Sequence, residues 1–374
     1  MKIIKNHNFN SNTPDIIKTM STWDMRNIYN FHRKIGNQQT PLLNLESLAE
    51  RLGVANIFVK DESSRLGLHS FKPLGSSYAM YKQIQSNPTI NTFCTATDGN
   101  HGRSVAWMAK KLDKKAVVYV PVGTAISRMN AIKSEGAIVH VVNGTYDETV
   151  NKASLRCIKE NRMAVENKWS LIQDTAWEGY EEIPLNIMKG YWTQIHEITK
   201  QINDEKIDIL ILQSGVGSWA ASIIGYIITH WDYLPLIISV EPMAANCLFE
   251  SIKIGKRISI NNQNRTIMAG LDCGTVSLKA WKILKNYINI SISISDDLTK
   301  EAMRIFARPK LNDQKVIAGE SGASGLGGLL ALHNLALTDK SYKNNYLSKT
   351  KSILLINTEG DTDPINYKKI VNDR

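Results

Sequence analysis

The stretch between residues 92 and 160 constrains the fold most strongly, because strand-like and helix-like segments alternate there without interruption. Strands are predicted over 92–97, 116–120 and 137–142, and helices over 101–112, 125–134 and 145–160. Strict alternation of this kind is typical of a parallel sheet with helices packed on it. The sequence therefore predicts a small α/β unit that ends near residues 170–174.

A second α/β run follows the first. Helices are predicted over 183–201, 218–230, 298–306 and 331–337, and strands over 207–213, 236–240 and 352–356, with a Gly/Ser turn at 319–328 and a loop at 340–351. Ahead of the small unit we expect irregular chain over 1–45, a helix over 43–52, a strand over 56–60 and a helix over 76–85. The chain has 374 residues, enough for two domains. We therefore predict that residues 1–88 and 173–374 form a large domain, and that 89–172 form a smaller inserted α/β domain.

Composition narrows the function classes. Hydrophobic residues make up 43% and charged residues 21%, an ordinary globular balance, and no apolar run approaches the ~20 residues of a membrane span. The net charge of +10 is dispersed without a basic and aromatic stripe, so neither a nucleic-acid nor a membrane partner is expected. Residues 1–21 lack an apolar signal-peptide core, and the four cysteines form no CxxC. We therefore expect a cytoplasmic location, no metal site and no disulfide framework.

One lysine stands in an unusual local sequence, Ser-Phe-Lys-Pro-Leu-Gly-Ser-Ser-Tyr over residues 70–78. Phe71 and Leu74 suggest that Lys72 is buried, and Pro73 fits the first turn of a helix. Burial makes an amine easier to deprotonate and hence a usable nucleophile. Such lysines bind carbonyl compounds covalently, including the aldehyde of pyridoxal phosphate (PLP). The alternative is an ordinary solvated surface charge.

Small and polar residues follow two of the predicted strands and precede helices. Thr97-Asp98-Gly99-Asn100 offers helix N–H groups to a substrate carboxylate, a carboxylate at Asp98, and an amide at Asn100 that can bond a phenolic oxygen. Gly215-Val216-Gly217-Ser218-Trp219 lets backbone amides reach a phosphate. The second stretch also fits G-x-G-x-x-A, with Glu241 ending the next strand, so a NAD-dependent dehydrogenase is a competing interpretation.

Two further polar strings carry candidate site residues. Asp174 lies in Gln-Asp-Thr-Ala-Trp-Glu-Gly-Tyr at the predicted domain junction, where clefts form. Thr358 follows an apolar strand in Asn-Thr-Glu-Gly-Asp-Thr-Asp and can place a hydroxyl at the strand's carboxyl end. Helix capping and tight turns are the alternatives for these strings and for the turn at Asp98.

Taken together, the order and wording of these motifs resemble the diaminopropionate ammonia-lyases, PLP enzymes of the tryptophan-synthase β-subunit type. The matching strings are F-K-x-L-G, T-D-G-N-H-G, Q-D-T-A-W-E-G-Y, the glycine loop, T-I-M-A-G-L, G-E-S-G-A and N-T-E-G-D-T-D, from Phe71 to Asp363. The resemblance implies a two-domain α/β PLP fold, in which each domain is a mostly parallel sheet covered by helices. It also implies a homodimer, since relatives are commonly dimers.

The resemblance implies a role for each candidate residue. Lys72 binds PLP and moves protons at Cα, Asn100 bonds the phenolic oxygen, and Thr358 faces the pyridine nitrogen. The phosphate-binding amides are those of Gly215, Val216, Gly217, Ser218 and Trp219, continuing to Ala220. The substrate-binding residues are Thr97, Asp98, Gly99 and Asp174. Of the two aspartates, one removes a Cα proton from the face opposite Lys72, and the other binds or protonates the departing β-amine.

The implied reaction is α,β-elimination of 2,3-diaminopropionate, in the D or L form or both, to pyruvate and ammonia through an aminoacrylate. Ser76, Trp219 and residues 272–278 depart from the family pattern and leave the substrate open. The alternatives are elimination or β-replacement on another 3-substituted alanine, and a PLP-fold protein that binds a ligand without turnover.

Overall fold

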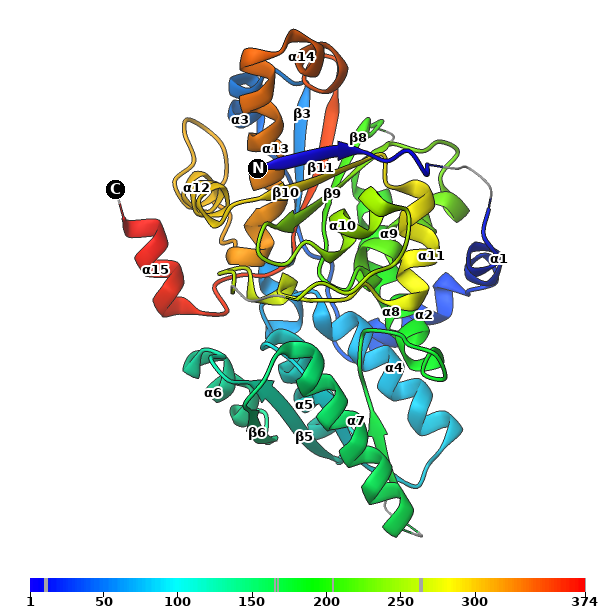
Figure 1. The fold of residues 1–374 in the computed structure, drawn as a ribbon. Helices are drawn as coiled ribbons and strands as arrows, with labels where there is room; N and C mark the ends of the chain where they lie inside the picture. The colour runs from blue at the N-terminus through cyan, green and yellow to red at the C-terminus, as the bar shows by residue number, and fades with distance from the viewer. Residues whose placement is uncertain (10–12, 165, 167, 204, 262–264, 374) are drawn as a thin grey trace.

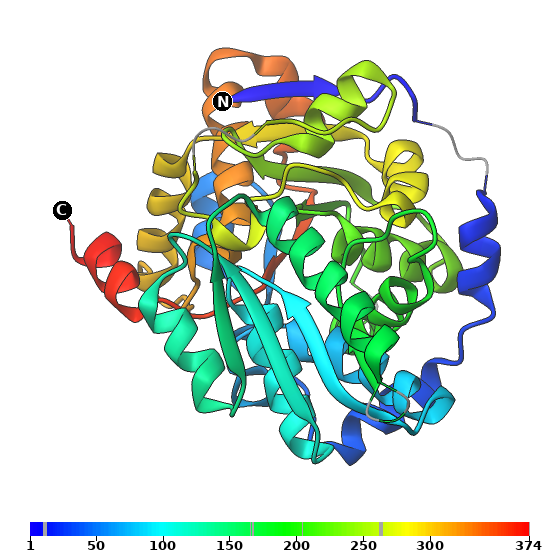
Figure 2. The same ribbon diagram turned by 60° about the horizontal axis from the view of Figure 1, so that its bottom comes forward.

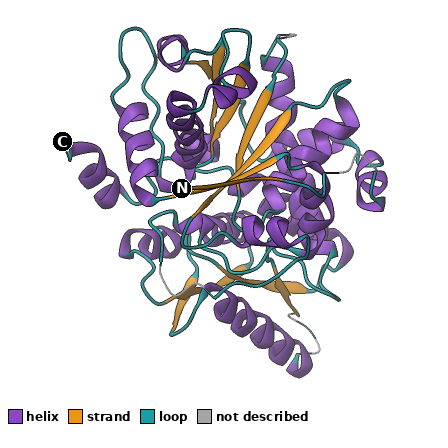
Figure 3. Ribbon diagram, turned by 45° about the horizontal axis from the view of Figure 1, so that its top comes forward, coloured by secondary structure: helices purple, strands orange, loops and turns teal. Residues whose placement is uncertain are grey.

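The computed structural model describes residues 1–373 apart from 10–12, 165, 167, 204 and 262–264. In these residues the chain forms two α/β domains, each built on its own sheet (Figure 1). Figure 3 shows the strands of each sheet enclosed between helices. The predicted fold class, a two-domain α/β architecture with mostly parallel sheets, is confirmed.

The described strands of the large sheet run parallel in the centre and antiparallel at both edges. The central strands are buried on both faces, as parallel sheets covered by helices require. Two of them are mainly apolar, whereas residues 290–294 alternate Ile and Ser. Their carboxyl ends therefore meet at one edge, where ligands bind in folds of this type. In spatial order the strands are β1 (Lys2–Lys5), β10 (Ile290–Ile294), β9 (Leu236–Pro242), β8 (Ile209–Gln213), β11 (Ser352–Asn357), β3 (Asn56–Asp61) and β2 (Leu42–Asn44).

The small sheet is parallel throughout its described strands, and Figure 2 brings it to the front. Its strands are β6 (Ile138–Val142), β5 (Lys115–Pro121), β4 (Ile90–Ala96) and β7 (Lys168–Leu171), and its helices are α5 (Asn100–Lys111), α6 (Ile126–Ser134) and α7 (Tyr146–Met163). The alternation predicted from the sequence is present, and β7 adds a strand that was not predicted. These strands all lie within the predicted insertion 89–172, whose end points stay a prediction.

Helices cover both faces of the large sheet. Helices α8, α9 and α11 pack on one face, and α3, α12 and α13 on the other. The helices of this domain, with two short 3-10 helices, are α1 (Asp15–Ser21), α2 (Met25–Lys34), α3 (Glu46–Leu52), η1 (Glu62–Gly67), α4 (Lys72–Ser86), α8 (Glu182–Gln201), α9 (Ser218–His230), α10 (Cys247–Ile254), η2 (Ala269–Leu271), α11 (Leu278–Tyr287), α12 (Asp296–Ala307), α13 (Glu320–Thr338), α14 (Lys340–Tyr346) and α15 (Pro364–Asn372).

Three predictions about this domain are wrong. The chain before residue 45 is not irregular, because it contains β1, α1 and α2, whose Ile28 and Phe31 are buried. Residues 340–346 form a helix instead of a loop. The Gly/Ser segment after Gly319 is the start of α13 instead of a turn. Its glycines serve close packing: a Cβ at Gly328 would lie 2.4 Å from the side chain of Val240.

Helix α4 joins the two domains and carries Lys72 as its first residue. It begins earlier than predicted, since Gly75 lies inside the helix. A Cβ at Gly75 would come within 2.5 Å of the Tyr191 ring on α8, so only a small residue allows this contact. On its other side, α4 packs against α5 of the small domain. The lysine is thus held at the seam of the two domains.

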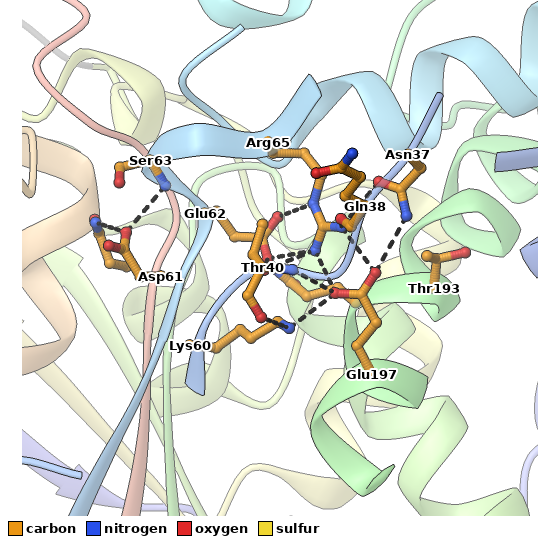
Figure 4. A network of polar contacts seen from close by, with 12 residues as sticks. Asn37, Gln38, Thr40, Lys60, Asp61, Glu62, Ser63, Arg65, Thr193 and Glu197 are labelled. Carbon is orange, nitrogen blue, oxygen red and sulfur yellow. Dashed lines mark hydrogen bonds and ion pairs between the residues drawn. The ribbon is translucent and has the colours of Figure 1, made fainter. Parts of the chain in front are cut away.

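A buried ionic network lies inside the large domain (Figure 4). Glu197 of α8 contacts Lys60 and Arg65, both at 2.8 Å, and Arg65 also contacts Glu62 at 2.7 Å. The backbone carbonyl of Thr40 accepts a further hydrogen bond from Lys60 at 2.8 Å. All four charged side chains are essentially inaccessible to solvent, so each charge depends on its partners.

Replacing Glu197 by Gln should lower the free energy of unfolding by about 3 kcal/mol, because it leaves two buried cations with one carboxylate. Burial raises the pKa of Glu197, but Arg65 and Lys60 outweigh burial and lower it. The stabilisation is therefore fully present above the ordinary carboxyl pKa, and it is lost as the pH falls from there through the lowered pKa of about 2. Urea unfolding at pH 7 and at pH 3 measures both effects.

The control for this prediction is Asp297→Asn, which removes an exposed ion pair with Lys300 on α12. An exposed pair contributes well under about 1 kcal/mol, so this variant should unfold like the parent. Equal destabilisation by the two variants would show that the buried network has no special role.

Candidate active site

A cavity at the seam of the domains contains every site residue that the sequence predicts. It lies at the carboxyl ends of β4, β8 and β11, beside the start of α4. The predicted residues that line it are Lys72, Thr97, Asp98, Gly99, Asn100, Asp174, Gly215, Val216, Gly217, Ser218, Trp219 and Thr358. Residues far apart in the sequence therefore converge on one site.

Lys72 and Asp174 form an ion pair with 2.6 Å between Nζ and Oδ2. Burial lowers the pKa of Lys72, but the Asp174 carboxylate outweighs burial and raises it, so the predicted lowering is wrong. Burial has the opposite effect on Asp174 and raises its pKa, but the positive charges of Lys72 and His101 outweigh burial and lower the pKa to about 2. The helix that follows begins at Glu182, which excludes a capping role for Asp174.

Asp98 occupies a different electrostatic environment from Asp174. Burial and the nearby carboxylate of Asp272 raise the pKa of Asp98 to about 7, against the opposing effects of Arg128 and Arg265. A carboxyl group with this pKa changes protonation near neutrality. Asp98 is therefore able to accept or donate a proton at working pH.

The turn that carries Asp98 is held by its own side chains. Thr97 Oγ1 accepts hydrogen bonds from the backbone N–H groups of Gly99 at 2.9 Å and Gly102 at 3.1 Å. Asn100, the first residue of α5, donates from Nδ2 to Oε2 of Glu359 at 2.5 Å. The turn thus presents Asp98 and the Asn100 amide to the cavity.

The glycine loop after β8 is shaped to receive an anion. Helix α9 begins at Ser218, so the N–H groups of its first turn have no acceptor within the helix. Gly217 has a φ of +83°, and its Cβ would lie 2.6 Å from Leu284, so the tight turn requires glycine. The N–H groups and the helix dipole suit a phosphate.

Trp219, a departure from the family pattern, packs away from this anion site. Its indole Nε1 donates to Gln194 of α8 at 2.8 Å, and its ring centroid lies 5.3 Å from that of Phe71. The indole is therefore fixed by contacts outside the glycine loop.

The dinucleotide interpretation fails at Glu241. Its carboxylate accepts the N–H groups of Leu248 at 2.8 Å and Phe249 at 2.6 Å, and it is fully buried. Because it caps α10, this carboxylate is not free to bind a ribose.

Several cavity residues escaped the sequence reasoning. Tyr146 OH lies 3.4 Å from Asp174 Oδ1, and Gln213 donates to Thr358 Oγ1 at 3.0 Å. Glu359 stands in the recognised string beside Thr358, so its position was a usable signal. Tyr146 and Arg128 come from helices of the small domain, where no local pattern marks them.

The cavity wall contains polar atoms without partners, which tests whether a polar cofactor fits. Among the described residues, Gln213 Oε1, His101 Nδ1, Arg128 Nε and Tyr191 OH are buried without a hydrogen bond. Buried polar atoms are normally satisfied, so these point to a polar ligand. With the Lys72 amine, the Thr358 hydroxyl and the anion site around the same cavity, the residues fit PLP.

Other kinds of site find no support in the described part of the chain. The four cysteines are free and buried, and no cluster of three or more His, Cys, Asp or Glu residues could hold a metal. None of the described helices combines the length and apolar character that a membrane span requires.

Comparison with known proteins defines the class to which this site belongs. Residues 34–344 match the family model of the pyridoxal-phosphate dependent enzymes, so the chain is a member of that class. It is 41% identical over 370 residues to the diaminopropionate ammonia-lyase of Salmonella typhimurium, covering 91% of this chain and 90% of the relative. The chain therefore belongs to the diaminopropionate ammonia-lyase family.

Solved structures agree with this assignment. The Escherichia coli diaminopropionate ammonia-lyase, in complex with an aminoacrylate-PLP azomethine reaction intermediate, superposes with a TM-score of 0.89 at 36% identity, over 99% of this chain and 96% of that chain. A threonine deaminase from Solanum lycopersicum has a TM-score of 0.77 at 22% identity, over 100% of this chain and 98% of that chain. This second likeness concerns the fold alone.

Proposed function

We propose that this chain is a PLP-dependent ammonia-lyase that converts 2,3-diaminopropionate, in its D or L form or both, to pyruvate and ammonia. The observation that carries the proposal is the cavity that brings Lys72, Asp98 and Asp174 together beside an anion-binding helix terminus. The family membership supports the same reaction.

The cavity offers one group for each part of PLP. The Lys72 amine would hold the aldehyde, the amides from Gly215 to Trp219 the phosphate, Thr358 the pyridine nitrogen and Asn100 the phenolic oxygen. When bound, PLP supplies an electron sink that makes the substrate's Cα proton acidic.

The two aspartates then divide the proton transfers. One aspartate accepts the Cα proton on the face opposite Lys72, whereas Lys72 moves the Cα proton on its own face. The other aspartate binds or protonates the β-amine, because an amide ion is a very poor leaving group. The substrate loses one ammonia, and hydrolysis of the resulting enamine gives pyruvate and a second ammonia.

A pyruvate assay across a substrate panel tests this function. We expect pyruvate from D- or L-diaminopropionate, with about two ammonia per pyruvate, as elimination followed by hydrolysis requires. A preference for O-substituted serines would instead indicate the alternative elimination or β-replacement. Bound PLP without turnover of any member would indicate a ligand-binding protein.

We also propose a homodimer and a cytoplasmic location. The dimer rests on the family resemblance, and the location is supported by the four buried, unpaired cysteines. Light scattering on the purified chain measures the mass of the assembly.

A further inference from the structure

Glu359 lies in the turn after β11, and its buried carboxylate connects the two domains. Oε1 accepts the backbone N–H of Ser321 in the first turn of α13 at 2.9 Å. Oε2 accepts from Asn100 Nδ2 of the small domain at 2.5 Å and from Thr362 Oγ1 at 3.2 Å. The residue is only 1% exposed, so its carboxylate is held by these bonds.

The backbone of Glu359 is also tied to the segment before Lys72. It forms an antiparallel bridge with Ser70, and Gly360 N–H donates to the carbonyl of His69 at 2.9 Å. The carboxylate is therefore fixed relative to the lysine. Through Asn100, the same residue reaches the first turn of α5.

Arg128 supplies the balancing charge from α6. Its side chain is 6% exposed, and its Nη2 lies 3.5 Å from Glu320 Oε2. Burial lowers the pKa of Arg128, but the surrounding carboxylates outweigh burial and raise it. In decreasing order of effect these carboxylates are Glu359, Glu320, Asp98 and Asp363. Glu359 is thus placed beside a permanent cation.

A carboxylate can only accept hydrogen bonds, and this decides how the Asn100 amide is turned. Facing Glu359, the amide must present its NH₂ group, which leaves one N–H for a second acceptor. A neutral side chain with both donor and acceptor atoms would allow the amide to flip and present its oxygen instead.

We propose that Glu359 is a positioning residue that fixes the Asn100 amide so that its second N–H faces the phenolic oxygen of the cofactor. The inference rests on the proposed binding of PLP, but not on the identity of the substrate. Arg128 places a permanent positive charge beside this carboxylate. Allowing the Asn100 amide to flip should therefore change the bound cofactor even before any substrate is added.

The variant Glu359→Gln tests this proposal. We expect about tenfold weaker PLP binding, as the loss of one good hydrogen bond implies. The visible absorbance of lysine-bound PLP changes with pH as the cofactor loses a proton. We expect the midpoint of this titration to rise by about one pH unit, because a phenolic oxygen without its N–H donor attracts a proton more strongly. Visible absorbance and circular dichroism of the PLP-loaded protein give these values without turnover.

The matched control is Glu320→Gln, which removes another carboxylate near Arg128 but has no hydrogen bond to Asn100. It should keep the parent midpoint. The double variant of Glu359→Gln with Asn100→Ala should show the same midpoint as Asn100→Ala alone, since Glu359 acts through Asn100. Should Glu359→Gln be insoluble, Glu359→Asp keeps the charge but draws it away from Asn100, and should shift the midpoint in the same direction.

An unchanged midpoint in the Glu359 variant, or an equal shift in Glu320→Gln, would overturn the proposal. So would a parent protein without a visible PLP band. A parent that binds PLP but releases no pyruvate, together with the expected midpoint shift, would refute the proposed reaction and leave the positioning role intact.

Discussion

Replacing Lys72 by Ala should reduce pyruvate release from diaminopropionate by more than ~10³-fold and abolish the visible absorbance of lysine-bound PLP. Among the described residues that line the cavity, Lys72 is the one lysine, so no other amine there can replace it. Spectra of the PLP-loaded variant and a pyruvate assay measure both losses.

The control for this experiment lies on the same helix. Lys82→Ala removes an amine that hydrogen-bonds Gln85 outside the cavity, and it should keep both the absorbance and the activity. Far-UV circular dichroism checks that the Lys72 variant is folded. Retention of the visible band after loss of Lys72 would refute the assignment of the cofactor-binding amine.

The sequence predicted this lysine because its neighbours are local. Phe71, Pro73 and Leu74 are adjacent in the chain, and the structure has the helix start that they indicate. These three neighbours are buried, whereas the side chain of Lys72 itself stays 18% exposed. The direction of the Lys72 pKa was wrong for a reason that local sequence does not contain. Asp174 is distant in the chain, and only folding brings its carboxylate to 2.6 Å from the amine.

The same distinction explains the rest of the fold and the site. Alternating apolar segments predicted the parallel sheets, because the period of a strand or helix is a local property. The glycines of α13 were misread as a turn, since their purpose is contact with strands far away in sequence. Tyr146 and Arg128 reach the cavity from helices whose orientation depends on domain packing, so their role was not predictable from their neighbours.

Replacing Asp98 by Asn should reduce turnover of D-diaminopropionate by about 100-fold or more, and that of the L-isomer by less than about tenfold. Asn keeps the shape of the side chain but cannot accept a proton. Asp98 lies among Asp272, Arg128 and Arg265, whereas Asp174 is engaged with Lys72, so the two carboxylates serve different parts of the cavity. Values of kcat/KM for each enantiomer measure the difference.

The pH dependence should identify the group as a base. With a pKa raised to about 7, Asp98 is ionised above neutrality and accepts a proton there. Activity on the D-isomer should therefore fall as the pH drops through 7, and this acid limb should be missing from the residual activity of Asp98→Asn. The comparison variant Asp174→Asn should impair both isomers, because it leaves Lys72 without its carboxylate partner. Equal losses on both isomers in Asp98→Asn would contradict the assignment of Asp98 to the Cα face opposite Lys72.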